Sequence, residues 1–334
     1  MMQAAFYKKE NNKVRCLLCP HQCLIREGET GICRVRRNTQ GTLMAETYGQ
    51  LSAFHLDPIE KKPLYHFHPG SYILSVGSVG CNMRCTFCQN YQISQTGLEL
   101  GDTEYFTKEK LLELAHSYPQ NIGIAFTYNE PVTFYEFMFD VAQASKAEGF
   151  KNVMVTNGFI EPEPLQDLFP YIDAYNVDLK SFHDKFYRNL TKSSLEPVKQ
   201  TLLSIRKAQK HLEITHLIIP GANDSTEEFQ QMVTWIHRTL GGETILHLSR
   251  YFPRYQMHEL ATPQAILEDF YAIAKQKLDY VYIGNIESPS AGNQTVCKHC
   301  GALLISRKGY NVRILNLSKQ GACAVCGGSN PVIV

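Results

Sequence analysis

Three closely spaced cysteines form the most informative motif of the chain. Cys81, Cys85 and Cys88 follow the pattern CxxxCxxC. Three thiolates this close together suit three irons of a [4Fe–4S] cluster, because cysteine is the usual protein ligand of such clusters. No fourth cysteine lies nearby, so one iron would stay open to a ligand that the protein does not supply. The alternative is that the three are buried core thiols on a loop.

The other eight cysteines form one group near each end of the chain. The N-terminal cysteine group, which begins as CxxCPxxC, consists of Cys16, Cys19, Cys23 and Cys33. The C-terminal cysteine group, two CxxCG knuckles around a hairpin-like stretch, consists of Cys297, Cys300, Cys323 and Cys326. An odd total of eleven cysteines, clustered at short spacings, predicts metal sites rather than disulfides.

The two outer groups differ in the metals that they suit. Four thiolates on two knuckles fit one tetrahedral ion, and for the C-terminal group we expect structural zinc, with a single iron as the alternative. The N-terminal group fits either zinc or an auxiliary [4Fe–4S] cluster, and His21 could replace one thiolate in a zinc site. A cluster would relay electrons to the triplet. Arg34, Arg36 and Arg37 beside this group predict a solvated basic face, or else a site for a nucleic acid or an acidic partner.

Between the cysteine groups, strand-like and helix-like stretches alternate. The predicted strands are 72–76, 122–127, 153–156, 174–179, 212–219, 244–248 and 280–283. The predicted helices are 108–117, 133–147, 195–210, 227–239 and 263–276, the last with Thr262 as its cap and Pro263 as its first residue. Repeated units of this kind predict an α/β fold, a partial (β/α)6-type barrel with helices outside its parallel sheet. We expect an N-terminal metal-binding segment 1–40, the barrel in 41–290 and a zinc-ribbon-like or rubredoxin-like domain in 291–334.

Chemistry in such barrels gathers on the loops at the C-terminal ends of the strands. The cysteine triplet follows the first predicted strand, so polar residues at the other strand ends become site candidates. They are Asn129, Glu130, Thr156, Asn157, Asp178, Lys180, His216, His247 and Arg250. The alternatives are a solvated turn carboxylate, an exposed ion pair and satisfied core histidines. Among the site candidates, His216, His247 and Arg250 are the ones that could contact a substrate. Arg250 could pair a carboxylate or phosphate bidentately.

The triplet resembles the signature of radical S-adenosylmethionine (SAM) enzymes. The resemblance implies a partial barrel whose cluster lies after the first strand, with its open iron chelated by SAM. An electron, from a donor such as flavodoxin or ferredoxin, then cleaves SAM to methionine and a 5′-deoxyadenosyl radical that takes hydrogen from the substrate. Phe87 stands where that family often has an aromatic residue near the adenine.

Other stretches resemble pyruvate formate-lyase activating enzymes, which are radical SAM relatives. Their Gly-Gly-Glu motif is here Tyr128-Asn129-Glu130, which implies that Asn129 and Glu130 hold the methionine end of SAM. Thr156-Asn157-Gly158 matches a second motif of the family. The pair Asp178 and Lys180 resembles their Asp-x-Lys motif, whose lysine is implied to contact the SAM carboxylate. Residues 57–70 resemble the AmmeMemoRadiSam-system branch, which implies a Memo-like partner.

Three functions remain as hypotheses. The first is a radical SAM enzyme that acts on an undetermined substrate, such as a protein or peptide. The second is an activase for a glycyl radical enzyme, although residues 89–178 lack the cysteines of a ferredoxin-like insert. The third is a non-catalytic, zinc-stabilised module that binds nucleic acid or protein. A net charge of +1 argues against nucleic acid. A polar N-terminus and the lack of long apolar runs predict a cytoplasmic protein that does not enter membranes.

Overall fold

A computed structural model describes residues 2–99, 102–286 and 291–334. Its centre is an eight-stranded sheet in the order β16-β15-β14-β13-β12-β11-β9-β8. Seven strands are parallel and coincide with the seven predicted ones: β9 (Tyr72–Gly77), β11 (Asn121–Phe126), β12 (Lys151–Thr156), β13 (Ala174–Asp178), β14 (His211–Ile218), β15 (Ile245–Arg250) and β16 (Val281–Gly284). The α/β prediction is therefore confirmed, and the sheet has one parallel strand more than the expected (β/α)6 type.

The sheet is open because its two edge strands do not pair with each other. One edge is β16, and the other is β8 (Ala53–Pro58), which runs antiparallel to β9. β8 was not predicted. The parallel strands are buried on both faces, as β9 illustrates, since every residue after Tyr72 in it is buried. Burial on both faces requires nearly continuous apolar runs, which is why these strands were recognisable in the sequence.

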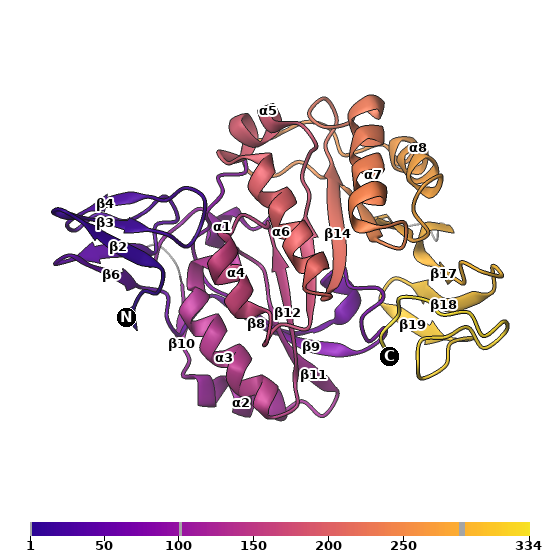
Figure 1. Ribbon diagram of the computed structural model, residues 1–334, viewed down its shortest axis with the longest axis horizontal. Coiled ribbons are helices and arrows are strands. Elements are labelled where there is room, and N and C mark those ends of the chain that lie inside the picture. Colours follow the sequence, from indigo (N-terminus) through magenta and orange to yellow (C-terminus); the bar gives the residue numbers. More distant parts are fainter. Residues whose placement is uncertain (1, 100–101, 287–290) are drawn as a thin grey trace.

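The five predicted helices are present, each within a few residues of its predicted bounds. They are α2 (Lys108–His116), α3 (Tyr135–Ala147), α6 (Leu195–Lys207), α7 (Thr226–Leu240) and α8 (Gln264–Lys275). The unpredicted helical segments are short: η1 (Ile59–Lys61), α1 (Tyr91–Ser94), η2 (Pro131–Phe134), α4 (Pro162–Leu168), α5 (Asp184–Phe186), η3 (Tyr187–Thr191) and η4 (Ala291–Asn293). Figure 1 shows α3, α4, α6 and α7 along one side of the sheet. No helix among the described residues is long and apolar enough to cross a membrane.

The predicted start of α8 is wrong by one residue. Pro263 is the N-cap rather than the first helical residue, and no side chain caps this helix. The hydroxyl of Thr262 instead donates to the carbonyl of Ile218 at 2.6 Å and accepts the N–H of Tyr251 at 2.9 Å. Thr262 therefore ties the loop after β15 to the end of β14.

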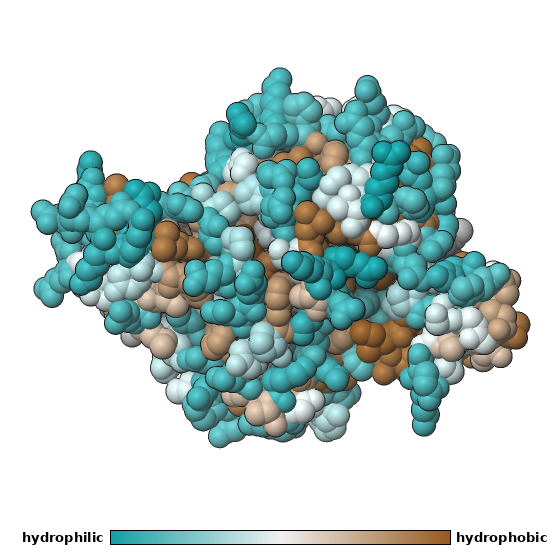
Figure 2. Space-filling model, viewed as in Figure 1, coloured by the Kyte–Doolittle hydropathy of each residue, from teal (hydrophilic) through white to brown (hydrophobic). Residues whose placement is uncertain are grey.

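Two small antiparallel sheets precede the barrel. One contains β2 (Tyr7–Glu10), β3 (Lys13–Cys16) and β4 (Leu24–Arg26), and the other contains β1 (Met2–Gln3), β5 (Arg36–Thr39) and β6 (Thr42–Ala45). A further pair joins β7 (Gln50–Leu51) to β10 (Glu104–Tyr105). The surface of the two N-terminal sheets is mostly hydrophilic (Figure 2), while Val14, Ile25 and Val35 are buried. The hairpin β5–β6 crosses residue 40, where we expected the first domain to end; that boundary stays a prediction.

A third three-stranded sheet follows the barrel at the end of the molecule opposite the N-terminal sheets (Figure 1). It contains β17 (Thr295–Val296), β18 (Leu303–Lys308) and β19 (Asn311–Ile314). The guanidinium of Arg307 donates to the carbonyl of Tyr65 at 2.6 Å, and Ile333 donates its N–H to the carbonyl of His66 at 2.8 Å. The C-terminal sheet therefore holds the loop before β9.

That loop closes the N-terminal end of the barrel over a buried carboxylate. Glu213 of β14 is fully buried and accepts the backbone N–H groups of Tyr65 at 3.0 Å and His66 at 2.8 Å. It also lies 2.9 Å from Nε2 of His211 and 2.6 Å from Nε2 of His247. Four partners around one carboxylate fix the loop across the bottom of the sheet, away from the strand ends where a site is expected.

Candidate functional site

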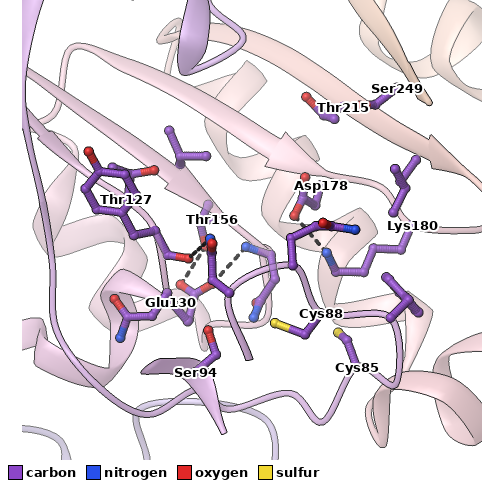
Figure 3. A pocket seen from close by; sticks show the side chains of 18 of the residues that line it. Cys85, Cys88, Ser94, Thr127, Glu130, Thr156, Asp178, Lys180, Thr215 and Ser249 are labelled. Carbon is purple, nitrogen blue, oxygen red and sulfur yellow. Dashed lines mark hydrogen bonds and ion pairs between the residues drawn. The ribbon is translucent and has the colours of Figure 1, made fainter. Parts of the chain in front are cut away.

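A cavity of about 600 Å³ opens at the C-terminal ends of the parallel strands. Its walls include all three triplet cysteines and residues that follow β11, β12, β13, β15 and β16. Figure 3 shows Cys85 and Cys88 on one side of this cavity, with Glu130 and the pair Asp178–Lys180 facing it. This is the arrangement that the strand-end argument predicts, since parallel strands bring their C-terminal ends to one edge.

The cysteine triplet lies on the loop between β9 and α1. Cys81 and Cys85 are buried and Cys88 is half-buried. Burial raises the pKa of all three thiols, that of Cys85 to about 12. The thiols are therefore protonated in the absence of metal, and metal binding must displace their protons. The N–H of Met83 donates to Sγ of Cys81 at 3.3 Å, which suits a thiolate that carries negative charge.

Glu130 is a buried carboxylate on the cavity wall. It accepts the Thr156 hydroxyl at 2.7 Å, a contact drawn between these two labelled residues in Figure 3, and the backbone N–H of Asn157 at 2.8 Å. The N–H of Val132 donates to it at 3.2 Å. Burial raises the pKa of Glu130 to about 7, although these donors oppose the rise. The carboxylate is thus fixed in position and lacks a cationic partner within the described chain, so it suits a ligand that brings a positive charge.

Asp178 and Lys180 form an ion pair on the opposite wall. Lys180 Nζ lies 2.7 Å from Asp178 Oδ2, and the lysine side chain is only 13% exposed, so the pair is not the exposed one considered above. Burial alone would lower the pKa of Lys180, but the charge of Asp178 outweighs it and the pKa lies above its ordinary value. Nζ also lies 6.0 Å from the ring centre of Phe87. A fixed cation beside an aromatic ring therefore faces the cavity.

Two asparagines connect the cavity wall to the triplet loop. Nδ2 of Asn129 donates to the carbonyl of Gly80 at 2.9 Å, and its Oδ1 accepts the N–H of Ser78 at 3.0 Å. Nδ2 of Asn157 donates to Oδ1 of Asn82 at 2.8 Å and lies 3.8 Å from Sγ of Cys81. Both asparagines line the cavity, and their side chains hold the loop that carries the cysteines.

The three candidates on later strands have different locations. Arg250 lines the cavity, with its Nε donating to the carbonyl of Thr262 at 2.8 Å. His216 does not line the cavity, contrary to expectation: it is buried against Phe229 of α7, with Nδ1 2.8 Å from the carbonyl of Leu179. His247 does not line it either, because it faces Glu213 at the bottom of the barrel. Neither histidine is in position to contact a ligand there.

Several lining residues were missed in the sequence. Lys62 is buried, lies 2.7 Å from Asp57 and packs 4.7 Å from the ring centre of Tyr128. Burial lowers the pKa of Lys62 to about 8, against the opposing effect of Asp57. The hydroxyl of Tyr128 donates to Asp57 at 2.6 Å. The sequence of residues 57–70 shows only a resemblance to one branch of the family, and nothing in it places Lys62 beside the cavity. The other missed lining residues include Lys61, Ser94, Thr215, Ser249 and Asn285.

The N-terminal cysteine group lines a small separate cavity together with Arg36 and Asn82. Arg36 is 2% exposed and pairs with the buried Glu136 of α3 at 2.5 Å. The prediction of a solvated basic face is therefore wrong for Arg36. His21 does not line this cavity, because its Nε2 donates to the carbonyl of Asn82 at 2.7 Å.

The C-terminal cysteine group forms a compact cage. All four of its sulfur atoms lie within 4.8 Å of one another, and the pairs Cys297–Cys326 and Cys300–Cys323 are each 3.7 Å apart. Thiolates at about 2.3 Å from one tetrahedral zinc ion are separated by roughly 3.8 Å. Burial alone would raise the pKa of Cys297, but N–H donors of Cys300 and His299 lower it to about 6. The group therefore fits a single metal ion with thiolate ligands.

Comparison with known proteins agrees with this geometry. The profile of the Radical SAM superfamily matches residues 75–236. An uncharacterized protein of Methanocaldococcus jannaschii is 41% identical over 338 residues, which span 100% of both chains. The pyruvate formate-lyase-activating enzyme of Clostridium pasteurianum is 23% identical over 202 residues, 59% of this chain and 83% of that enzyme.

A solved structure shares the fold. A radical SAM methyltransferase from Sphaerobacter thermophilus superposes with a TM-score of 0.53 at 15% identity, covering 71% of each chain. The superfamily match begins in β9 and extends into α7, so it contains the triplet, Glu130 and Lys180. The chain belongs to the radical SAM superfamily and is homologous to the pyruvate formate-lyase activating enzymes.

Proposed function

We propose that the chain is a radical SAM enzyme that acts on a protein or peptide side chain. The triplet would hold a [4Fe–4S] cluster, and SAM would occupy the cavity of about 600 Å³ beside it. When bound and reduced, these groups supply a 5′-deoxyadenosyl radical that takes a hydrogen atom from the substrate. The observation that carries the proposal is that the triplet, Glu130 and Lys180 line one cavity, although the sequence places them as many as 99 residues apart (81 to 180).

The lining residues would divide the binding of SAM between them. The buried carboxylate of Glu130 suits the amino group of the methionine end, because it has hydrogen-bond donors but no cation to balance its charge within the described chain. Lys180 suits the carboxylate of SAM, and Phe87 beside it offers an apolar face to the adenine. Asn129, Thr156 and Asn157 would act by fixing Glu130 and the triplet loop.

The outer part of the cavity remains for the substrate. Lys61 and Arg250 line it together with the exposed Phe252. Cationic and apolar side chains at the exposed rim of a cavity of this size suit a polypeptide segment better than a small neutral metabolite. A one-electron carrier such as flavodoxin or ferredoxin would supply the electron, and a Memo-like protein is the partner that the resemblance of residues 57–70 suggests. The C-terminal group would hold zinc in a structural role, since its closed cage leaves no open position.

The test is cleavage of SAM by anaerobically purified and reconstituted protein. With dithionite and SAM, we expect 5′-deoxyadenosine in the wild type and its loss in Cys85→Ala, which removes one cluster ligand. Cys300→Ser is the matched control, because it removes a thiol from the cage at the other end of the chain. Zinc alone, with no cluster and no 5′-deoxyadenosine after reconstitution, would contradict the proposal and favour the non-catalytic binding module.

A glycyl radical activase is the second candidate. It is favoured by the similarity to the pyruvate formate-lyase-activating enzyme of Clostridium pasteurianum. The reduced protein would be mixed with SAM and a glycyl radical enzyme from the same genome. A glycyl radical signal in electron paramagnetic resonance (EPR) would support this narrower role. SAM cleavage without that signal would leave the broader proposal standing.

A further inference from the structure

The two outer cysteine groups differ in how widely their sulfur atoms are spaced. Among the described residues, only the C-terminal group brings three or more potential ligand atoms within 4.8 Å of one another. All four cysteines of the N-terminal group line one small cavity, yet their sulfurs do not meet that spacing. The triplet does not meet it either. Because a [4Fe–4S] cluster places each thiolate on a different iron, its ligands stand farther apart than those around one zinc ion.

A buried arginine supplies a second, independent observation. Arg36 lines the same cavity, is 2% exposed, and its Nε–H has no hydrogen-bond partner among the described residues. Its two terminal nitrogens are satisfied by Glu136 at 3.0 and 2.5 Å and by the carbonyl of Ala5 at 3.1 Å. A buried N–H without an acceptor is costly, so a ligand that accepts from it is indicated. The sulfides of an iron–sulfur cluster accept N–H groups, and a zinc ion brings no acceptor of its own.

The N-terminal group packs directly against the loop of the triplet. Gly80, next to Cys81, has a φ of +84°, and a Cβ at this position would lie 2.6 Å from the carbonyl oxygen of Cys33. Asn82, on the other side of Cys81, lines the N-terminal cavity, and His21 donates to its carbonyl. The guanidinium of Arg84 donates to the carbonyl of Ile32. Both cysteine loops therefore belong to one packed unit.

From the spacing, the orphaned Arg36 Nε–H and this packing, we propose that the N-terminal cysteine group binds a second [4Fe–4S] cluster and that this cluster passes electrons to the triplet. Cys19 and Cys23 are half-buried, whereas Cys16 and Cys33 are buried. An electron would enter at the half-buried side and leave through the contact between Cys33 and Gly80. The relay rests on the proposed function, but the identity of the metal does not.

The relay balances one electron at a time. A low-potential carrier protein of the flavodoxin or ferredoxin class loses one electron, and the N-terminal cluster goes from the 2+ to the 1+ state. It returns to 2+ as the triplet cluster becomes 1+. Glu136 balances the charge of Arg36, so the Nε–H of Arg36 beside the site is what favours the more negative, reduced state of the first cluster.

The metal is tested in a variant that keeps the N-terminal group and loses the triplet. We expect anaerobically reconstituted C81A/C85A/C88A to retain about four irons and four sulfides per chain, half of the wild-type content. Dithionite should give it the EPR signal of a reduced cluster. Zinc in place of that iron would overturn the proposal. This result does not depend on SAM cleavage, so it distinguishes a wrong metal from a wrong function.

Two further variants test the surroundings and the relay. Arg36→Lys keeps a charge for Glu136 but lacks Nε–H, so in the triplet-free background the reduction potential and the EPR signal should shift. An unchanged signal and potential would contradict contact between Arg36 and the cluster.

In C16A/C19A, the triplet cluster should be reduced by flavodoxin at least tenfold more slowly than in the wild type, while dithionite still reduces it. Equal rates with flavodoxin would overturn the relay.

Discussion

Replacement of Glu130 by glutamine should change how the stability of the protein depends on pH. The carboxyl group is 2% exposed, and burial raises its pKa to about 7, compared with about 4.5 in the unfolded chain. Between these two pH values the folded state keeps a proton that the unfolded state has lost. The free energy of unfolding must therefore fall as pH rises through this window, and it becomes constant above pH 7.

The size of the effect follows from the width of the window. One pKa unit corresponds to about 1.4 kcal/mol, so a rise from 4.5 to about 7 costs the wild type about 3 kcal/mol at pH 8 relative to pH 4. Glutamine cannot ionise, so Glu130→Gln lacks this cost. The new amide also faces the N–H of Asn157 and the hydroxyl of Thr156, which adds a penalty that does not vary with pH.

The assay is urea unfolding of the wild type and the variant across this pH range under anaerobic conditions. In the difference between the two free energies of unfolding, the titrations of all other groups cancel. The variant should gain about 3 kcal/mol of stability relative to the wild type from pH 4 to pH 8. The infrared carbonyl band of a protonated carboxylic acid, present only in the wild type, should disappear with a midpoint near pH 7.

The same group makes a second measurement informative. Because the amino group of SAM donates its N–H best to an ionised Glu130, SAM affinity of the wild type should fall as pH drops below 7, by at most about tenfold per pH unit. The affinity of Glu130→Gln should be weaker and should lack this dependence. A free-energy difference that stays constant with pH would refute the burial argument. A pH-independent SAM affinity in the wild type would refute the assigned contact alone.

Three other perturbations have defined outcomes. Glu213→Ala removes the acceptor of four donors and should destabilise the protein by about 3–5 kcal/mol in urea unfolding. Hydrogen bonds hold the pKa of Glu213 well below its ordinary value against the effect of burial, so the wild type should lose this stability only as pH falls below about 4.5. A loss of stability already present at pH 6 would contradict the reasoning. Gly80→Ala should lower the free energy of unfolding more than Gly149→Ala does in urea unfolding, and it should release iron. Both glycines have positive φ, but only Gly80 faces the carbonyl of Cys33. Equal losses of free energy would show that the close contact is unimportant. Cys300→Ser should remove about one zinc per chain with no loss of iron in elemental analysis, and a parallel loss of iron would contradict a separate C-terminal site.

The parallel strands were predictable because both of their faces are buried. Two of the unpredicted strands, β8 and β2, lie at sheet edges and carry polar residues: β8 contains His55 and Asp57 and ends at Pro58, and β2 reads Tyr-Lys-Lys-Glu. Such strands have no continuous apolar run, and proline is confined to strand edges and ends. The fate of Arg36 was also beyond the sequence, because its partner Glu136 is 100 residues away on α3.

The period of the strands explains which site residues were predictable. Alternate residues of β14 face the inside of the barrel, so Glu213 lies at the bottom and Thr215 and Leu217 line the cavity. His216 has the opposite parity and packs against α7, as counting by two from Thr215 would have shown.

Height along the strand matters as much as parity. On β15, His247 and Ser249 share the inward face, but His247 lies one layer lower, where its Nε2 contacts Glu213, and only Ser249 reaches the cavity. A residue near a strand end is therefore a site candidate only if it faces inward and lies in the last inward layer. Asp178, the last residue of β13, meets both conditions. The loop that supplies Tyr65 and His66 to Glu213 follows no such period, which is why the polar core beneath the cavity could not be foreseen.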